Sequence, residues 1–283
     1  MDISDLKNKC AASNFRPDKR LGQNFLIDRN IRDKILGFLP VTKDTQVLEI
    51  GPGFGMMTES LSMMAKKVFA VEKDKELCRI MKSDFLERKN VELISSDILE
   101  VDLEEIQKRA GGKLFVYGNV PYNITSLIIE KIIAARSVVD GLYMVIQEEV
   151  ASRLCAAPGT KIYGSISCFV QYYASVRKIF RISKNCFFPK PKVGSCLIGL
   201  NFFKEPFFSV KDEEMMFLII RKAFSQRRKK VLNPLASDTF LGLNKDSWMR
   251  ALTAAGIDPQ SRAEDISLEE YTRISNEVVE LLR

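Results

Sequence analysis

The stretch VLEIGPGFG, residues 47–55, decides the fold of this chain. Its beginning has the pattern of a buried strand, and the three glycines that follow, Gly51, Gly53 and Gly55, permit tight turns and a close approach of a ligand to the backbone. A strand that leads into such a loop is typical of a nucleotide-like cofactor site. The G-x-G-x-G spacing and the missing amide donor at Pro52 disfavour NAD. A plain glycine turn remains the alternative when the glycines are taken alone.

Short β-branched runs alternate with helical patterns through the first two thirds of the chain. This alternation predicts an α/β fold, with a Rossmann-like parallel sheet whose ligands bind at the carboxyl ends of the strands. Two later runs predict antiparallel strands, and the pattern then becomes helical, so we expect a catalytic domain over 1–205 and a helical domain over 206–283. The expected strands are 47–50, 68–71, 91–94, 114–117, 142–147, 176–182 and 195–203, and the expected helices are 215–224, 245–255 and 268–282.

The composition of the chain narrows its chemistry. No histidine occurs among the 283 residues, which excludes imidazole bases and histidine metal sites. The six cysteines are scattered without a C-x-x-C pair, so we expect neither a metal nor a disulfide framework. The net charge of +7 suits a polyanionic partner. A polar beginning and the lack of an apolar run of about 20 residues predict a cytoplasmic protein with no membrane partner, and we expect a monomer.

Two acidic residues follow expected strands. Glu72 ends the second strand about 20 residues after the glycines, where a carboxylate can accept both hydroxyls of a ribose. Asp97 follows the third strand, where it can accept a hydrogen bond from an adenine amino group. Either acid alone is more often a solvated loop residue, but their register with the glycine loop favours a nucleoside cofactor.

The most informative segment is GNVPY, residues 118–122, which follows the fourth expected strand. It resembles the catalytic motif of adenine dimethyltransferases that use S-adenosylmethionine. Four more segments extend the resemblance over nearly the whole chain, to the KsgA family of small-subunit ribosomal RNA adenine N6,N6-dimethyltransferases: LGQNFLID at 21–28, FFPKPKV at 187–193, FSQRRKK at 224–230 and RAEDIS at 262–267. The chain departs from the family at Gly194, where aspartate is common, so a loop contact made by that carboxylate is lost or replaced.

The resemblance implies a Rossmann-like S-adenosylmethionine methyltransferase domain with a role for each matching residue. The implied cofactor-binding set is Asn24, Leu26, Gly51, Glu72, Asp97 and Asn119, with Gln23 and Gly53 as further candidates. The implied catalytic set is Asn119, Pro121, Tyr122 and Phe187. Tyr122 and Phe187 would stack on an adenine flipped out of its helix. Phe188 does not match the stacking position, and we expect it in the core.

The chemistry of adenine explains why these residue types are needed. Its exocyclic amine is a poor nucleophile, because the lone pair is delocalised into the ring. Acceptors on the amine hydrogens, supplied by Asn119 and by the backbone carbonyl of Val120 or Pro121, would favour a pyramidal nitrogen aimed at the methyl group. The methylated nitrogen is acidic enough to lose its proton to water, so the absence of histidine poses no difficulty.

Two clusters of basic residues are candidates for binding RNA through its phosphates. The main cluster precedes and follows Phe224, and a second lies near the amino terminus. A charge run is more often a solvated helix face, which is the alternative reading without the catalytic motif. The RNA-binding candidates are Arg221, Lys222, Arg227, Arg228, Lys229 and Lys230, joined by Lys7, Lys9, Arg16, Lys19 and Arg20.

We therefore expect dimethylation of adenine N6 in a hairpin loop of small-subunit ribosomal RNA, coupled to ribosome biogenesis. A large-subunit dimethylase of the resistance type shares the catalytic motifs, but the carboxy-terminal match favours the small-subunit enzyme. A DNA adenine methyltransferase is an alternative on the Asn-x-Pro-Tyr motif alone. A non-catalytic ribosome-assembly or RNA-binding factor is a third, although Asn119 and Tyr122 are intact. A dehydrogenase is disfavoured by the glycine spacing.

Overall fold

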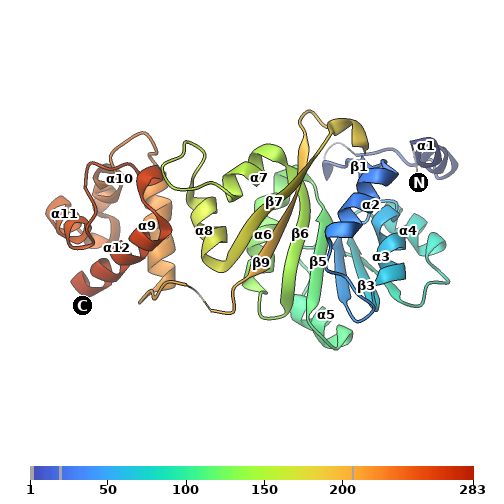
Figure 1. Cartoon of the computed structure of the whole chain (residues 1–283), viewed down its shortest axis with the longest axis horizontal. Helices are drawn as coiled ribbons and strands as arrows, with labels where there is room; N and C mark the ends of the chain where they lie inside the picture. The colour runs from blue at the N-terminus through green and yellow to red at the C-terminus, as the bar shows by residue number, and fades with distance from the viewer. Residues whose placement is uncertain (1–2, 19–20, 206) are drawn as a thin grey trace. The chain divides into compact units, whose positions relative to one another are not determined.

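The structure is a computed structural model that describes residues 3–18, 21–205 and 207–283 (Figure 1). The chain divides into two compact units. Unit 1 comprises Met1–Ala151 and Val176–Phe202, and unit 2 comprises Ser152–Ser175 and Phe203–Arg283. The helical unit begins close to the expected boundary, but it also contains Ser152–Ser175, which we expected in the catalytic domain.

Unit 1 is built on a seven-stranded sheet, which confirms the predicted α/β fold. Its first five strands in spatial order are parallel, and β9 runs antiparallel to β6. The central strands are apolar and buried along almost their whole length, as expected where helices cover both faces of a parallel sheet. In spatial order the strands are β4 (Val91–Ser95), β3 (Lys67–Glu72), β2 (Gln46–Ile50), β5 (Leu114–Asn119), β6 (Val139–Gln147), β9 (Ser195–Phe202) and β7 (Ala174–Ile182).

Three helices of unit 1 begin at side chains that cap them. Asp28, Asp74 and Asp102 each accept hydrogen bonds from backbone N–H groups in the first turn of α2, α4 and α5. The unit contains α1 (Ile3–Ala12), α2 (Arg29–Phe38), α3 (Met56–Met64), α4 (Lys75–Asp84), α5 (Leu103–Ala110), η2 (Tyr122–Ile124), α6 (Thr125–Ala134), most of α7 (Glu148–Leu154) and η3 (Lys184–Cys186). Within the described ranges, no helix is both long and apolar enough to cross a bilayer.

A short second sheet decides where two neighbouring phenylalanines point. β1 (Phe25–Leu26) pairs antiparallel with β8 (Phe187–Phe188), so that Leu26 faces Phe187 and Phe25 faces Phe188. Consecutive strand residues project to opposite faces. Phe187 therefore packs with Leu26 in the main core and is 3% exposed, whereas Phe188 is half-buried against a smaller cluster. Phe187, which we expected to stack on the adenine, therefore lies in the main core, and Phe188 packs against the smaller core cluster.

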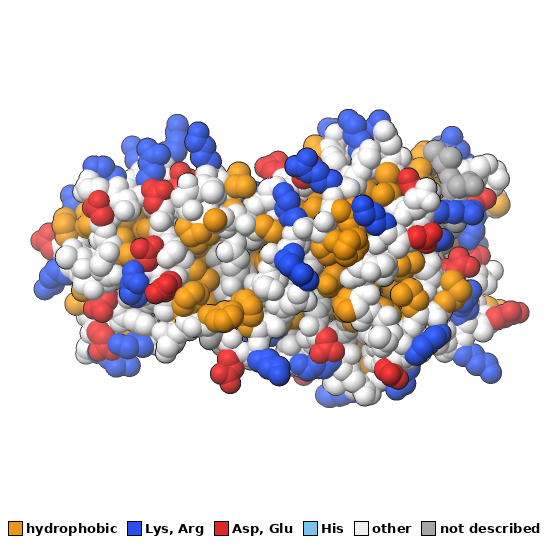
Figure 2. All heavy atoms as spheres, in the orientation of Figure 1, with side chains coloured by type: hydrophobic (Ala, Val, Ile, Leu, Met, Phe, Trp, Pro, Cys, Tyr) orange, Lys and Arg blue, Asp and Glu red, His pale blue; other side chains and the backbone are white. Residues whose placement is uncertain are grey.

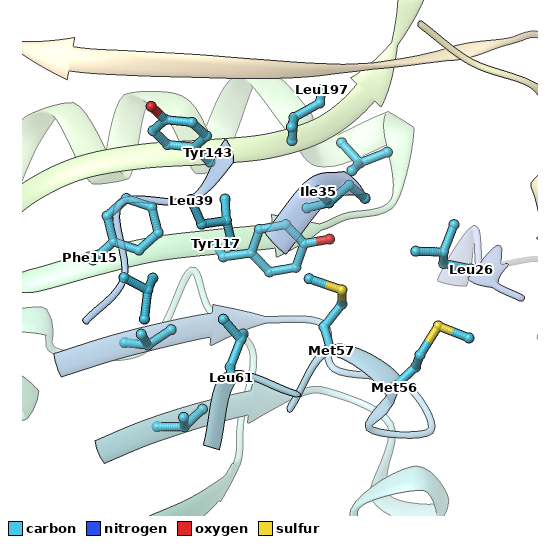
Figure 3. Close-up of a cluster of buried hydrophobic side chains, with 14 of the residues drawn as sticks. Leu26, Ile35, Leu39, Met56, Met57, Leu61, Phe115, Tyr117, Tyr143 and Leu197 are labelled. Carbon is cyan, nitrogen blue, oxygen red and sulfur yellow. The ribbon is translucent and has the colours of Figure 1, made fainter. Parts of the chain in front are cut away.

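The main core of unit 1 supports the ends of β2 and β5. Figure 3 shows Tyr117 of β5 among Ile35 of α2, Leu39 directly after that helix, and Met57 and Leu61 of α3. These side chains are all under 7% exposed. The packing fixes the carboxyl ends of β2 and β5, where the glycine loop and the GNVPY segment begin.

Unit 2 is helical and packs around buried aromatic side chains. Trp248 is fully buried, and the buried Tyr271 donates from its hydroxyl to the Ala263 carbonyl at 2.9 Å. Three helices agree with the expected ones, while the sequence patterns did not predict the others. The unit contains α8 (Ser165–Tyr173), α9 (Glu213–Phe224), α10 (Leu232–Leu235), η4 (Ser237–Gly242), α11 (Lys245–Ala254), η5 (Ala263–Asp265) and α12 (Leu268–Leu281).

Candidate active site

A cavity of unit 1 lies beyond the carboxyl ends of the parallel strands. It brings together residues that are up to 122 positions apart in the chain, from Leu6 to Ile128. The predicted cofactor and catalytic residues line it with one exception. The lining includes Asn24, Leu26, Gly51, Glu72, Asp97, Asn119, Pro121 and Tyr122, as well as Gln23 and Gly53. Phe187 is not among the lining residues and is buried in the main core.

The glycine loop turns sharply between β2 and α3. Gly51, Gly53 and Gly55 have φ angles of +68°, +60° and +78°, in the left-handed region that favours glycine. A Cβ at Gly53 would lie 2.8 Å from the Phe25 ring, and one at Gly51 would lie 3.4 Å from the backbone oxygen of Asn119. The loop is therefore close to both β1 and the catalytic segment, and side chains larger than hydrogen would separate them.

Glu72 is held at the end of β3 by backbone donors. Its Oε2 accepts from the N–H of Gly53 at 3.2 Å and its Oε1 accepts from the N–H of Asp74 at 2.9 Å. Burial raises the pKa of Glu72 to about 7, although these two N–H groups favour the ionised form. Each carboxylate oxygen can accept a further hydrogen bond, as binding to two ribose hydroxyls requires.

Asp97 lies next to a cation in the same cavity. Its Oδ2 is 2.7 Å from Nζ of Lys73, and its Oδ1 accepts from the N–H of Leu99 at 3.0 Å. Burial alone would raise the pKa of Asp97, but the hydrogen bonds from Lys73 and Leu99 outweigh it and lower that pKa. Asp97 is therefore ionised at neutral pH and can accept from an amino group.

Asn119, the last residue of β5, is oriented by the amino-terminal segment. Its Nδ2 donates to the backbone carbonyl of Asn24 at 3.2 Å. Asn24 in turn donates from its side chain to the carbonyl of Gly22 at 2.9 Å. Because the amide nitrogen of Asn119 is used in this contact, its Oδ1 remains the atom that can accept from a substrate amine.

Tyr122 begins η2 directly after Pro121, and a serine on another strand holds its hydroxyl. Tyr122 Oη and Ser195 Oγ are 2.7 Å apart, and Ser195 is fully buried at the start of β9. Burial raises the pKa of Tyr122, although the hydrogen bond with Ser195 opposes the shift. The phenol is therefore neutral at physiological pH, which fits a ring that contacts a base rather than a proton acceptor.

Two buried polar groups also line the cavity. Glu49 and Tyr117 face each other in the register of β2 and β5. Oε2 of Glu49 and the hydroxyl of Tyr117 have no hydrogen-bond partner among the described residues. Burial raises the pKa of Glu49 to about 8, with the charge of Glu72 adding to the rise while hydrogen bonding to Thr58 opposes it. A protonated Glu49 is the less costly form of a carboxyl buried in this way.

Comparisons with known proteins give the family. The family model described as ribosomal RNA adenine dimethylase matches residues 14–280. The chain belongs to the ribosomal RNA adenine dimethylase family. It is 40% identical over 266 residues to the "Ribosomal RNA small subunit methyltransferase A" of Alkaliphilus metalliredigens, with 93% of this chain and 92% of the relative covered. It is 39% identical to the Clostridioides difficile protein of the same name, with 93% and 91% covered.

Solved structures of related proteins share the fold of this family member. A dimethyladenosine transferase from Plasmodium falciparum has a TM-score of 0.73 at 22% identity, with 88% of this chain and 95% of that chain covered. The 23S rRNA methyltransferase ErmE has a TM-score of 0.67 at 22% identity, with 90% and 99% covered. At these identities the likeness concerns the fold alone.

Several residues that line or support the site could not be predicted from local sequence patterns. Ser195 is 73 positions from Tyr122, and Leu6 reaches the cavity from α1, so no local pattern links either to the site. Lys73 could have been predicted as a cavity residue, because it directly follows Glu72 at a strand end. Glu49 could have been predicted too, since a carboxyl inside an otherwise apolar strand is unusual.

The predicted RNA-binding residues of unit 2 differ in whether their side chains already make hydrogen bonds or ion pairs within the protein. Arg227 donates to the carbonyls of Lys161 and Tyr163 and pairs with Glu264, so its guanidinium is part of the packing of the unit. Lys222 pairs with Asp238 at 3.1 Å, and Lys230 contacts Gln260. Arg221, Arg228 and Lys229 are exposed and make no ion pair within the described ranges.

The amino-terminal basic residues differ in their ion pairing and exposure. Lys9 forms an ion pair with Asp84, which ties α1 to α4. Lys7 and Arg16 are exposed. Lys19 and Arg20 lie outside the described residues.

Proposed function

We propose that this chain transfers methyl groups from S-adenosylmethionine to the N6 amine of adenines in small-subunit ribosomal RNA, two to each adenine. One observation carries the proposal: a single cavity joins the glycine loop, Glu72 and Asp97 to Asn119 and Tyr122. The substrate is supported by the relatives named ribosomal RNA small subunit methyltransferase A, which are 36–40% identical over nearly the whole chain.

The cofactor half of the cavity fits S-adenosylmethionine by the chemistry of its donors and acceptors. When bound, the cofactor supplies an electrophilic methyl group on a sulfonium. Glu72 accepts from the two ribose hydroxyls, and Asp97 accepts from the adenine amino group. Gly51 leaves room for the methionine portion beside the backbone of Asn119. Leu26 of β1 and Asn24, which precedes this strand, would cover the cofactor.

The substrate half holds the amine of the target adenine. Asn119 accepts one amine hydrogen at Oδ1, because its Nδ2 is bonded to Asn24. The carbonyl of Pro121 already accepts from the N–H of Ile124 and the hydroxyl of Thr125. The Val120 carbonyl is therefore the better acceptor for the second hydrogen. Together the two acceptors orient the nitrogen lone pair toward the methyl group.

The flipped adenine stacks on Tyr122, whose ring is fixed through Ser195. Stacking of this kind contributes roughly 1–3 kcal/mol per base. Phe187 can join the stack only if its ring moves out of the core, since it is 3% exposed. A hairpin loop suits this arrangement because its adenines are unpaired and are the cheapest to extrude.

The remaining assignments follow from the substrate. The exposed Arg221, Arg228 and Lys229 of unit 2 contact RNA phosphates, and the protein acts as a monomer in the cytoplasm during assembly of the small subunit.

The proposal is tested by offering labelled S-adenosylmethionine to the purified protein with three substrates. These are small ribosomal subunits from a strain that lacks the modification, large subunits from the same strain, and duplex DNA. We expect label in N6,N6-dimethyladenine of the small-subunit RNA alone. Transfer only to large-subunit RNA or DNA would overturn the substrate, and no transfer to any of them would overturn the catalytic role.

A further inference from the structure

The positive charge of the chain is concentrated in one segment. Residues 150–204 contain nine basic side chains and no aspartate or glutamate, so this segment carries more than the whole net charge of +7. Six of the nine lie in the part of the segment that belongs to unit 1: Arg177, Lys178, Arg181, Lys184, Lys190 and Lys192. We call these six residues the β7 basic strip.

The β7 basic strip is on the surface of the catalytic unit. All six side chains are exposed. They lie on β7, which is the edge strand of the sheet, and on the loop that leads from it to β9. Figure 2 shows Lys and Arg side chains gathered over β7 and along this loop. The neighbouring acid is Glu148, which pairs with Arg181 at 2.6 Å and leaves Arg181 with a 75% exposed side chain.

The loop that carries half of the strip is linked to the substrate half of the cavity through Ser195. The loop that holds Lys184, Lys190 and Lys192 also contains β8, and it ends at Ser195, the residue that holds the hydroxyl of Tyr122. A nucleic acid whose flipped base reaches Tyr122 must therefore bring its flanking phosphates close to this loop. The strip lies where that polyanion would pass.

We propose that the β7 basic strip is a second RNA-binding surface, located on the catalytic unit, which holds the phosphate backbone beside the target adenine. It consists of other residues than the predicted contacts of unit 2. The proposal rests on the proposed function, because the partner is the substrate RNA. Exposed lysines on an edge strand can also serve only to prevent pairing with another sheet. That purpose would be met by charges of either sign, whereas here every charged residue of the segment is basic.

The test compares two variants with the same change in net charge. The first carries Arg177→Glu, Lys178→Glu and Lys184→Glu. The matched control carries Lys66→Glu, Lys108→Glu and Lys113→Glu, three exposed residues away from the strip. Lys66 and Lys113 directly precede β3 and β5. Affinity for a small-subunit RNA stem-loop is measured from low to moderate salt, along with the KM and kcat of methyl transfer and the affinity for S-adenosylmethionine.

We expect the strip variant to bind the stem-loop at least about tenfold more weakly at low salt, with the slope of log Kd against log salt reduced by about 2. Its KM for RNA should rise while kcat and cofactor affinity stay near wild type, and the control should change RNA affinity by less than about threefold. Equal losses of RNA affinity in both variants would overturn the proposal. An unchanged salt slope of the strip variant would also overturn it, whether or not that variant self-associates. Failure of the wild-type protein to methylate small subunits would instead overturn the proposed function.

Discussion

The hydroxyls of Tyr122 and Ser195 lie 2.7 Å apart and join the turn after β5 to the start of β9. Ser195 is fully buried, so the hydrogen bond is shielded from water and fixes the tilt of the Tyr122 ring. Because Tyr122 lines the cavity where the adenine is proposed to stack, Ser195 acts on the reaction through Tyr122. It is a positioning residue.

Removing either hydroxyl should have the same consequence. Ser195→Ala and Tyr122→Phe each delete a hydrogen bond of about 1 kcal/mol, so we expect kcat to fall about fivefold in each. The double variant should be no slower than the worse single variant, because only one interaction is lost. Steady-state rates at saturating RNA measure this. Additive losses would show that the two hydroxyls act independently.

Substitutions at Phe187 and Phe188 should distinguish a structural role of these rings from a catalytic one. Phe187→Ala empties a site in the main core, and we expect it to lower the free energy of unfolding by about 3–5 kcal/mol. Phe188→Ala affects a half-buried ring and should cost clearly less. Denaturant unfolding measures both, and Phe187→Leu serves as the conservative control. If Phe187→Leu keeps the stability but loses most turnover, the ring itself reaches the substrate.

Glu49 makes stability depend on pH. Its pKa is about 8 in the folded protein, well above the ordinary value of 4.5, because burial disfavours the ionised form. Between these two values the unfolded chain binds fewer protons than the folded one, so the free energy of unfolding falls as pH rises from about 5 to 8. Glu49→Gln keeps the side chain neutral, and we expect it to stabilise the protein at pH 9 but not at pH 5. Thermal unfolding at the two pH values tests this, and an equal effect at both would contradict it.

Glu72 should make cofactor binding depend on pH. Its pKa near 7 in the free protein means that a growing fraction is protonated below neutrality, and a protonated oxygen is a poorer acceptor for ribose hydroxyls. We expect the Kd for S-adenosylmethionine to rise about tenfold from pH 8 to pH 6. Glu72→Gln should bind more weakly at pH 8 and lose most of this dependence. Calorimetric titration tests both statements, and a flat profile in the wild type would refute the role of the carboxylate.

The sequence predicted the sheet well because each central strand is buried on both faces. A strand such as β2 or β5 must then be a short apolar run, and the loops that follow such runs are placed at one edge of the sheet. This is why Glu72 and Asp97 could be assigned with the glycine loop to one site, whereas the role of Asn119 was assigned from the family resemblance.

The remainder depended on contacts that no local pattern records. The two-residue pairing of β1 with β8 is too short to show a period, yet it decides that Phe187 rather than Phe188 enters the core. Ser152–Ser175 lies between strands of unit 1 and still packs with the helical unit. Leu6 lines the cavity from α1, and Ser195 contacts Tyr122 from the start of β9, so only the folded chain reveals their place in the site.

The most direct test of the account is a single-turnover measurement with Asn119→Ala. The protein is saturated with labelled S-adenosylmethionine and mixed with unmodified small subunits, so that weaker cofactor binding does not limit the rate. Because Asn119 Oδ1 is proposed to accept from the adenine amine, the rate of methyl transfer should fall by roughly 10²–10³ relative to the wild type while the RNA is still bound. A rate close to that of the wild type would contradict the proposed role of Asn119 in the cavity.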